Sequence, residues 1–220
     1  MSVTTKRTVG IQRLTVMAML CAVAYLSVFL CSPIKVQFLS FDIKDCILSI
    51  GGFLYGPIFG VLSVILVSFL EMVTFSQTGP IGLLMNIVSS AAFLLPSALY
   101  YKKDRSLKGA IIGLSLSVVI TSGVMLLWNW VITPFYMNVP RTVVASMLLP
   151  LILPFNALKS AVNAVLSVLL YKNVVTALRK ARLIPPSARE ATVSSHRWSW
   201  LFAVLFVILT TILLWWSGII

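Results

Sequence analysis

Amide and charged side chains recur within the apolar stretches of this sequence. Asn156, Lys159 and Asn163 are three and four residues apart in "LPFNALKSAVNAVL", so one face of a helix carries all three. An amide presents two donors and an acceptor with two lone pairs, so several amides around one space can read the edge of a heterocycle. These residue types indicate a binding site inside an otherwise apolar protein.

Two further amides lie in apolar segments. Asn129 stands between Trp128 and Trp130 in "LLWNWVITP", and Asn86 lies in "GLLMNIVSS". A tryptophan here can stack on a flat ligand, but in a membrane protein it is more often an interfacial anchor. Asparagines within membranes also join helices to one another. The pattern therefore leaves both interpretations open for these residues.

Charged residues also interrupt the apolar segments. "FDIKD" brings Asp42, Lys44 and Asp45 to the start of an apolar stretch, and Glu71 lies in "SFLEMVTF". An ionised group in apolar surroundings takes a partner or changes its protonation state. Glu71 and Lys159 are therefore either a structural ion pair between helices or two groups that face a ligand cavity. The accompanying amides favour the cavity.

The sequence contains no set of residues typical of catalysis or metal binding. Its one histidine, His196, lies in a polar segment beside Arg197, and no G-x-x-x-x-G-K-[ST] phosphate-binding loop occurs. Cys21, Cys31 and Cys46 show no C-x-x-C spacing and are interpreted as small apolar residues. We expect no enzymatic activity, no metal and no cofactor. Any uphill transport must take its energy from an ion gradient or from a separate subunit.

The composition indicates an integral membrane protein. The chain has 220 residues, 60% of them hydrophobic, and a mean hydropathy of +1.04. Continuous apolar runs of about 20 residues match the thickness of a bilayer, and they lack the period-two alternation of a β-barrel. We predict an all-α, polytopic transmembrane helix bundle. The predicted spans are 11–32, 43–56, 57–76, 80–101, 107–133, 150–178 and 199–219.

These spans predict a chain of three parts. Residues 1–183 form a six-helix substrate-binding core, residues 184–198 a polar linker, and residues 199–220 an additional C-terminal transmembrane helix. "GGFLYGP" at 51–57 is expected to form a tight turn between the second and third spans. The segment 134–149 contains two prolines and is expected to be a loop or an interfacial piece.

The basic residues predict an orientation. With a cytoplasmic N-terminus, 13 of the 17 basic residues lie on the cytoplasmic side, as the positive-inside rule requires. They are Lys6, Arg7, Arg13, Lys102, Lys103, Arg105, Lys108, Lys172, Arg179, Lys180, Arg182, Arg189 and Arg197. The net charge of +12 is therefore a topology signal, and no nucleic-acid partner is expected.

Charges of both signs gather on the other side, where the same rule predicts few. Because charged groups within spans usually face a bundle interior or a wet cavity, they indicate a polar site near the outer face. They are Lys35, Lys44, Arg141, Lys159, Asp42, Asp45 and Glu71.

Five segments carry a family resemblance. In chain order they are "FLSFDIKD", "GGFLYGPIFG", "VSFLEMVTFSQTGPIGLLMNIVSS", "LLWNWVITPFYMNVPR" and "LLPLILPFNALKSAVNA", which span most of residues 11–183. Together they resemble the S components of energy-coupling factor (ECF) vitamin transporters, and within that family the riboflavin-binding member. The resemblance implies six helices in a bacterial plasma membrane, with the vitamin bound near the outer face under the loop after the first helix. A helix at 199–219 departs from this six-helix pattern.

The resemblance also implies roles for individual residues. Asn129, Asn156 and Lys159 resemble the residues that hydrogen-bond the isoalloxazine edge. Asp42 and Lys44 from the capping loop, with Glu71, are suited to the ribityl hydroxyls or to ordering that loop. Other residues are candidates for the pocket wall. The full set of expected ligand-binding residues is Asp42, Lys44, Glu71, Thr78, Asn86, Trp128, Asn129, Asn156, Lys159 and Asn163.

The first predicted span contains a pair of small residues. Ala18 and Ala22 in "AMLCA" are four apart, a spacing that lets helices approach closely and by itself predicts ordinary packing. They match the alanine motif that the family uses against its transmembrane coupling subunit. The resemblance therefore implies four partners: riboflavin, the coupling subunit and two ATP-binding cassette ATPases that drive uptake.

Other functions stay open at this stage. Lys35, Lys44 and Arg141 can receive a phosphate, so flavin mononucleotide or another vitamin is an alternative ligand. A stand-alone ion-coupled carrier that uses Glu71 and Lys159 as a proton relay is an alternative of a different class. An intramembrane enzyme has little support because no nucleophile and base are visible.

Overall fold

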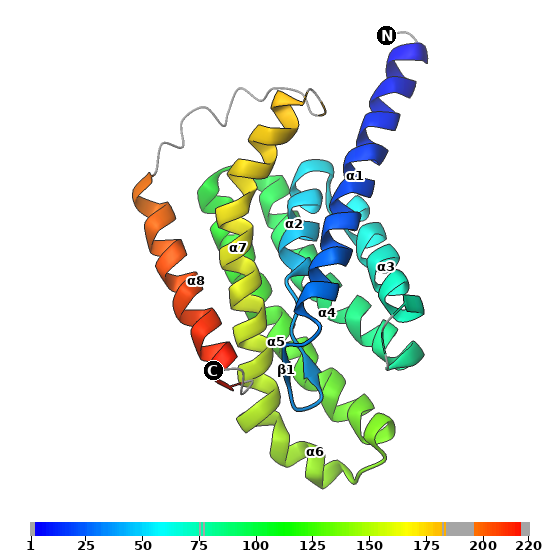
Figure 1. Cartoon of the computed structure of the whole chain (residues 1–220), viewed down its shortest axis with the longest axis vertical. Coiled ribbons are helices and arrows are strands. Elements are labelled where there is room, and N and C mark those ends of the chain that lie inside the picture. Colours follow the sequence, from blue (N-terminus) through cyan, green and yellow to red (C-terminus); the bar gives the residue numbers. More distant parts are fainter. Residues whose placement is uncertain (1–2, 75, 77, 182, 184–195, 217–220) are drawn as a thin grey trace.

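The computed structural model of the chain is an all-α bundle, as the sequence predicts (Figure 1). It describes residues 3–74, 76, 78–181, 183 and 196–216. The longer helices are α1 (Val3–Cys31), α2 (Lys44–Tyr55), α3 (Pro57–Thr74), α4 (Gly79–Lys103), α5 (Leu107–Met137), α7 (Leu153–Lys180) and α8 (His196–Trp216). The shorter elements are β1 (Lys35–Val36), β2 (Leu39–Ser40), α6 (Arg141–Met147) and the π-helical turn η1 (Leu148–Ile152).

Five helical segments within the described residues are long and apolar enough to cross a membrane. They are Gly10–Cys31, Pro57–Thr74, Gly79–Lys103, Leu107–Met137 and Arg141–Lys180. The second predicted span corresponds to α2, whose 12 residues extend only ~18 Å and so fall short of the hydrocarbon thickness. The crossing of the membrane by α8 stays a prediction, and the linker at 184–198 lies mostly outside the described residues.

α2 is short because it lies at the centre of the bundle. It packs against α1, α3, α4 and α7, and most of its residues are buried. Gly51 faces Leu20 of α1 and Gly52 faces Ala98 of α4, and a Cβ at either glycine would lie 3.4 Å from these side chains. The two glycines therefore let α1 and α4 approach the central helix closely.

The prediction of a tight turn over 51–57 is wrong for all but the last two of these residues. The α2 helix continues through these glycines to Tyr55, and the chain turns at Gly56, which has a φ of 97°. Glycine adopts such a positive φ without steric cost. Pro57 then begins α3, where its missing N–H loses no hydrogen bond.

The segment 134–149, expected to be a loop or an interfacial piece, is mostly helical. α5 continues through Pro134 to Met137, and α6 begins only a few residues later, at Arg141. Pro134 lies in the last turn of α5, which therefore continues through it without the backbone hydrogen bond that its missing N–H would make. Asn138 ends α5 in the left-handed conformation, with its N–H bonded to Pro134 O. Pro140 precedes α6 as its N-cap residue.

The segment between α1 and α2 is a small hairpin that closes one end of the bundle (Figure 1). Its strands pair antiparallel, with Val36 opposite Leu39. Both side chains, with Phe41, are buried in one apolar cluster with Ile152 and Phe155. The hairpin is therefore anchored to the π turn and the start of α7, and this anchoring directs the following residue, Asp42, into the bundle.

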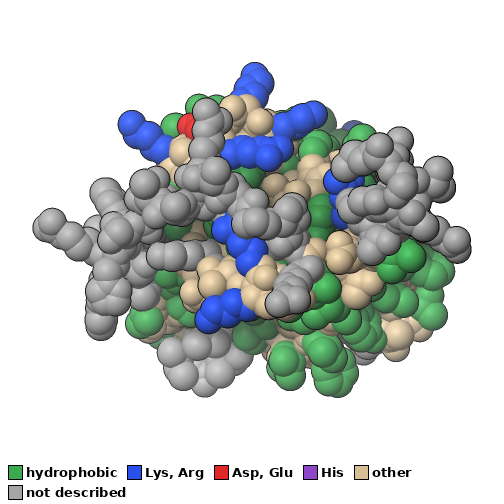
Figure 2. Space-filling model, turned by 90° about the horizontal axis from the view of Figure 1, so that it is seen from above, with side chains coloured by type: hydrophobic (Ala, Val, Ile, Leu, Met, Phe, Trp, Pro, Cys, Tyr) green, Lys and Arg blue, Asp and Glu red, His purple; other side chains and the backbone are tan. Residues whose placement is uncertain are grey.

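The two ends of the bundle differ in character. The hairpin and α6 lie at one end, and the start of α1, the α2–α3 turn and the α4–α5 loop lie at the other (Figure 1). Seen from that second end, several Lys and Arg side chains lie on the visible face of the molecule (Figure 2). We call it the basic end. α8 lies along α7, and its Trp216 ring is 6.5 Å from the ring of Phe155.

Candidate functional site

Four charged side chains form a continuous network between the hairpin end of α2 and the helices α3 and α7. Lys159 Nζ donates to Asp42 Oδ2 at 2.7 Å, and Lys44 Nζ donates to Glu71 Oε2 at 2.8 Å. Lys44 Nζ also lies 3.9 Å from Asp42 Oδ2, which connects the two pairs. Glu71 and Lys159 are thus linked through two intermediates, and the direct Glu71–Lys159 pair considered from the sequence does not form.

The network is almost completely shielded from solvent. The side chain of Lys44 is 1% exposed, and that of Asp42 is 5% exposed. Burial alone would raise the pKa of the Asp42 carboxyl, but the ammonium groups of Lys159 and Lys44 outweigh it and hold the pKa below its ordinary value. Asp42 therefore stays ionised between two cations. Buried ions tolerate only arrangements that keep them paired, so the network fixes the hairpin end relative to α3 and α7.

Asn163 joins α7 to the start of α2. Its Oδ1 accepts from Cys46 N at 2.9 Å, and its Nδ2 donates to Asp42 O at 3.0 Å. Ile43, the residue before α2, provides no side-chain cap, so the first turn of α2 would otherwise leave buried N–H groups without acceptors. Asn163 therefore caps α2 from the neighbouring helix.

Asn129 on α5 and Asn156 on α7 are buried, and each uses part of its hydrogen-bonding capacity. Asn129 Nδ2 donates to Met125 O at 2.7 Å, and its Oδ1 accepts from Thr133 Oγ1 at 2.8 Å. Asn156 Nδ2 donates to Ile152 O at 2.8 Å. Within the described part of the chain these are their side-chain bonds, so each amide keeps a second N–H for another partner.

The chain just before Asn156 departs from regular α-helix. The π-helical turn Leu148–Ile152 contains Pro150, which has no N–H to donate. π turns within helices occur frequently at functional sites. The sequence pattern does not predict this turn, because a π turn has no simple periodic signal.

Asp45 is absent from the set of ligand-binding residues expected above, although it lies in the same "FDIKD" segment. It is buried on α2. Its Oδ1 and the Oδ1 of Asp42 have no hydrogen-bond partner among the described residues. A buried carboxylate oxygen without a partner is costly. These two oxygens therefore have unused capacity to accept hydrogen bonds.

The sequence and the fold both match known transporter subunits. The profile of the family "ECF transporter, substrate-specific component" matches residues 12–171. This chain belongs to that family. It also resembles a solved structure, described as "Structure and mechanism of the S component of a bacterial ECF transporter", with a TM-score of 0.63 at 30% sequence identity. The match covers 76% of this chain and 97% of the other, so we call this chain an S component below.

Two curated relatives match this chain over most of their own lengths. The riboflavin transporter RibU of Staphylococcus aureus (strain TCH60) is 31% identical over 77% of this chain and 93% of its own. The riboflavin transporter FmnP of Bacillus subtilis (strain 168) is 28% identical over 73% of this chain and 90% of its own. The family consists of membrane transporter components, so the S component is a multi-pass membrane protein and its family carries out transport.

Three of the remaining expected binding residues differ in their surroundings. Asn86 Nδ2 donates to Glu71 Oε1 at 2.9 Å, so it extends the ion network of the S component. Thr78 lies before α4, and its Oγ1 is 2.8 Å from Ser76 Oγ. Trp128 is half-buried on α5. The structure thus links Asn86 directly to the network, whereas no bond to the network is found for Thr78 or Trp128 among the described residues.

The positions of Lys44 and of the two alanines on α1 can be compared with the roles that the resemblance implies. Lys44 is the first residue of α2 and not part of the capping loop in which the resemblance places it. Ala18 and Ala22 are exposed on α1, whereas Leu20 and Cys21 between them are buried. The small-residue pair therefore does not serve packing within the described part of this chain. The roles of all these residues in binding and coupling stay predictions.

Proposed function

We propose that this S component binds riboflavin and serves as the substrate-specificity subunit for its uptake. The observation that carries the proposal is the similarity to two curated riboflavin transporters, each matched over at least 90% of its length. The chemistry of the buried polar residues also supports the proposal. Riboflavin has a flat ring with a polar edge and a hydroxylated tail, and such a ligand needs amides and a few charges within a largely apolar site.

The proposed contacts divide between the two parts of the vitamin. Asn129, Asn156 and Lys159 donate to the isoalloxazine edge through N–H groups that the described bonds leave unused. The ribityl hydroxyls donate to the Oδ1 atoms of Asp42 and Asp45, which lack partners among the described residues. Flavin is then the transported ligand and not a resident cofactor.

The proposed energy source is a set of partner subunits. The N-terminus faces the cytoplasm in this proposal, so the basic end meets an ECF transmembrane coupling subunit and two ATP-binding cassette ATPases. Ala18 and Ala22 offer the coupling subunit an exposed face on which a partner helix can approach closely. The S component itself needs no nucleotide site in this arrangement.

Uptake of labelled riboflavin tests the whole proposal. Cells that lack their own riboflavin importer should accumulate the vitamin only when the S component and an ECF coupling module are both expressed. Substituting the catalytic glutamate of both ATPases should abolish this uptake. Uptake without the module that follows an imposed proton gradient would instead show an ion-coupled carrier.

The alanine face predicts a separation of binding from transport. Ala18→Leu with Ala22→Leu should leave the affinity for riboflavin within about two-fold, because both side chains are exposed and distant in sequence from the proposed contacts. Uptake should fall to the level of cells without the module, because leucine prevents close helix approach. The matched control is Val23→Leu with Met19→Leu, on the same exposed helix. Normal uptake by the alanine double variant would contradict the assigned face.

Flavin analogues test which residues meet which part of the ligand. Asp45→Ala should weaken binding of riboflavin roughly 5-fold, because it removes the acceptor and a net hydrogen bond contributes about 0.5–1.5 kcal/mol. Binding of lumiflavin, which lacks the ribityl chain, should change little. Equal losses for both ligands would remove the assigned contact. Competition between riboflavin and flavin mononucleotide for the wild-type protein decides which of the two flavins binds more tightly. Lys44 is already bonded to Glu71 and is not free to receive the phosphate of flavin mononucleotide.

A further inference from the structure

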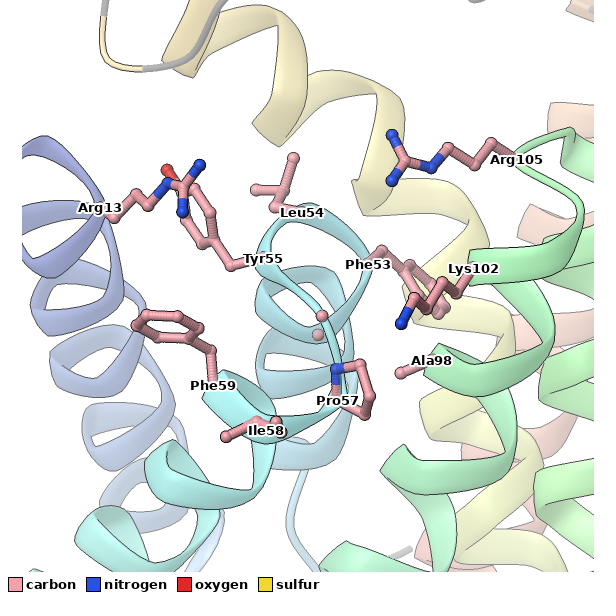
Figure 3. A pocket seen from close by; sticks show the side chains of 12 residues that line it. Arg13, Phe53, Leu54, Tyr55, Pro57, Ile58, Phe59, Ala98, Lys102 and Arg105 are labelled. Atoms are coloured by element: carbon pink, nitrogen blue, oxygen red, sulfur yellow. The ribbon is translucent and has the colours of Figure 1, made fainter. Parts of the chain in front are cut away.

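A cavity lies at the end of α2 opposite to the ion network (Figure 3). Its volume is about 420 Å³. Arg13 from α1, Lys102 from the end of α4 and Arg105 from the following loop line it, together with the α2–α3 turn. Lys44 begins α2 and Tyr55 ends it, so the helix separates this cavity from the network by about 18 Å.

The cavity carries positive charge that the described part of the protein does not neutralise. Arg13, Lys102 and Arg105 form no ion pair with any carboxylate of the described residues. The nearest acid in sequence, Asp104, uses its Oδ1 to accept from Ser106 N. Several Lys and Arg side chains gather on the same face of the molecule (Figure 2). An anion is therefore the complementary occupant.

A hydroxyl group in the cavity wall also lacks a partner. The oxygen of Tyr55 is buried and makes no hydrogen bond to any described residue. Its ring lies beside the guanidinium of Arg13 (Figure 3). A buried O–H without an acceptor is costly. The hydroxyl and the guanidinium can both donate to one oxygen-rich anion, which would satisfy both.

The rest of the wall is apolar and reaches the lipid-facing surface. Phe53, Pro57 and Phe59 line the cavity, and so does Ile58, which is 75% exposed on α3. Arg13 lies near the start of the apolar span Gly10–Cys31, and Lys102 near the end of the span Gly79–Lys103. The cavity is therefore at the depth of lipid headgroups, with an apolar side open toward acyl chains.

We propose that this cavity binds the phosphate group of an anionic phospholipid from the adjoining leaflet. Basic pockets between transmembrane helices are suited to such headgroups. The phosphate accepts from Arg13 and Tyr55 on one side of the cavity, Lys102 and Arg105 on the other side add positive charge (Figure 3), and the acyl chains lie along Ile58 and Phe59. A soluble phosphate would satisfy the same donors but would leave the apolar wall without a partner. The inference concerns a different site from that of riboflavin and does not depend on the proposed function.

Native mass spectrometry of the purified full-length protein tests the proposal. Phosphatidylglycerol and phosphatidylcholine with identical acyl chains are titrated onto detergent-solubilised protein. The wild type should retain phosphatidylglycerol preferentially. Arg13→Gln with Arg105→Gln should lower the affinity for phosphatidylglycerol roughly 30-fold, because each cation near the surface contributes about a five-fold factor. The helical content and unfolding transition of each variant, measured in parallel, report on the fold.

A matched control removes the same charge outside the cavity. Lys103 and Lys108 are exposed at the same end and do not line it, so Lys103→Gln with Lys108→Gln should retain the preference. Should the arginine double variant not fold, Tyr55→Phe decides, with an expected loss of roughly five-fold. Equal retention of both lipids, an equal loss in the lysine control, or displacement of phosphatidylglycerol by millimolar inorganic phosphate would each overturn the proposal.

Discussion

Lys159→Met should raise the dissociation constant for riboflavin by roughly 30-fold or more, because truncating one partner of a buried, hydrogen-bonded charge pair costs about 2–5 kcal/mol. The substitution removes an ammonium that lies 2.7 Å from Asp42 Oδ2. It removes a proposed donor to the ring edge and also the main partner of the carboxylate that the hairpin carries. Flavin fluorescence quenching by purified protein measures the effect.

Two comparisons make this result specific. Lys35→Met removes a cation from an exposed position of the same hairpin and should leave the affinity unchanged. Lys159→Met should weaken lumiflavin binding as strongly as riboflavin binding, because the proposed contact is to the ring. If both flavins bind the variant with wild-type affinity, Lys159 is only a structural partner of Asp42.

Lys44→Met should be the most destabilising substitution in the network. Lys44 bridges Glu71 at 2.8 Å and Asp42 at 3.9 Å, and its side chain is 1% exposed. Its removal leaves Glu71 without its cation and Asp42 with only Lys159. Breaking a buried pair by removing one partner costs about 3–5 kcal/mol. The unfolding temperature in detergent, followed without ligand, should therefore fall clearly below that of the wild type.

A second substitution tests the cause of this loss. Glu71→Gln on the Lys44→Met background removes the unpaired carboxylate and should recover part of the lost stability. Lys35→Met again serves as the control with the same change of charge. A Lys44→Met variant as stable as the wild type, or a double variant less stable than both single variants, would contradict the network as the element that fixes this end of the bundle.

Much of the bundle could be predicted from the sequence because apolar length is a strong signal. All of the predicted spans except the second correspond to long helices, and the polar residues on α7 share a face as their spacing indicates. The sequence could not show whether Glu71 pairs directly with Lys159. Partner choice depends on which helices meet, and spacing along one helix does not report that.

The errors arose where tertiary packing overrides a local signal. Two adjacent glycines favour a turn, but Gly51 and Gly52 lie within α2 because α1 and α4 pack closely against them. Pro134 favours a loop, but α5 continues through it for one more turn without the backbone hydrogen bond that its missing N–H would make. The unpartnered Oδ1 of Asp45 could not be predicted either, because nothing in the sequence shows whether a carboxylate oxygen has a partner.

Titration of riboflavin with the purified wild-type protein tests the binding claim most directly. The proposed site predicts that flavin fluorescence is quenched to saturation at one riboflavin per chain. Isolation of the protein as a yellow complex from cells that contain the vitamin should accompany it. A colourless protein that leaves the fluorescence of added riboflavin unchanged, while its helical content and unfolding transition are intact, would contradict the account.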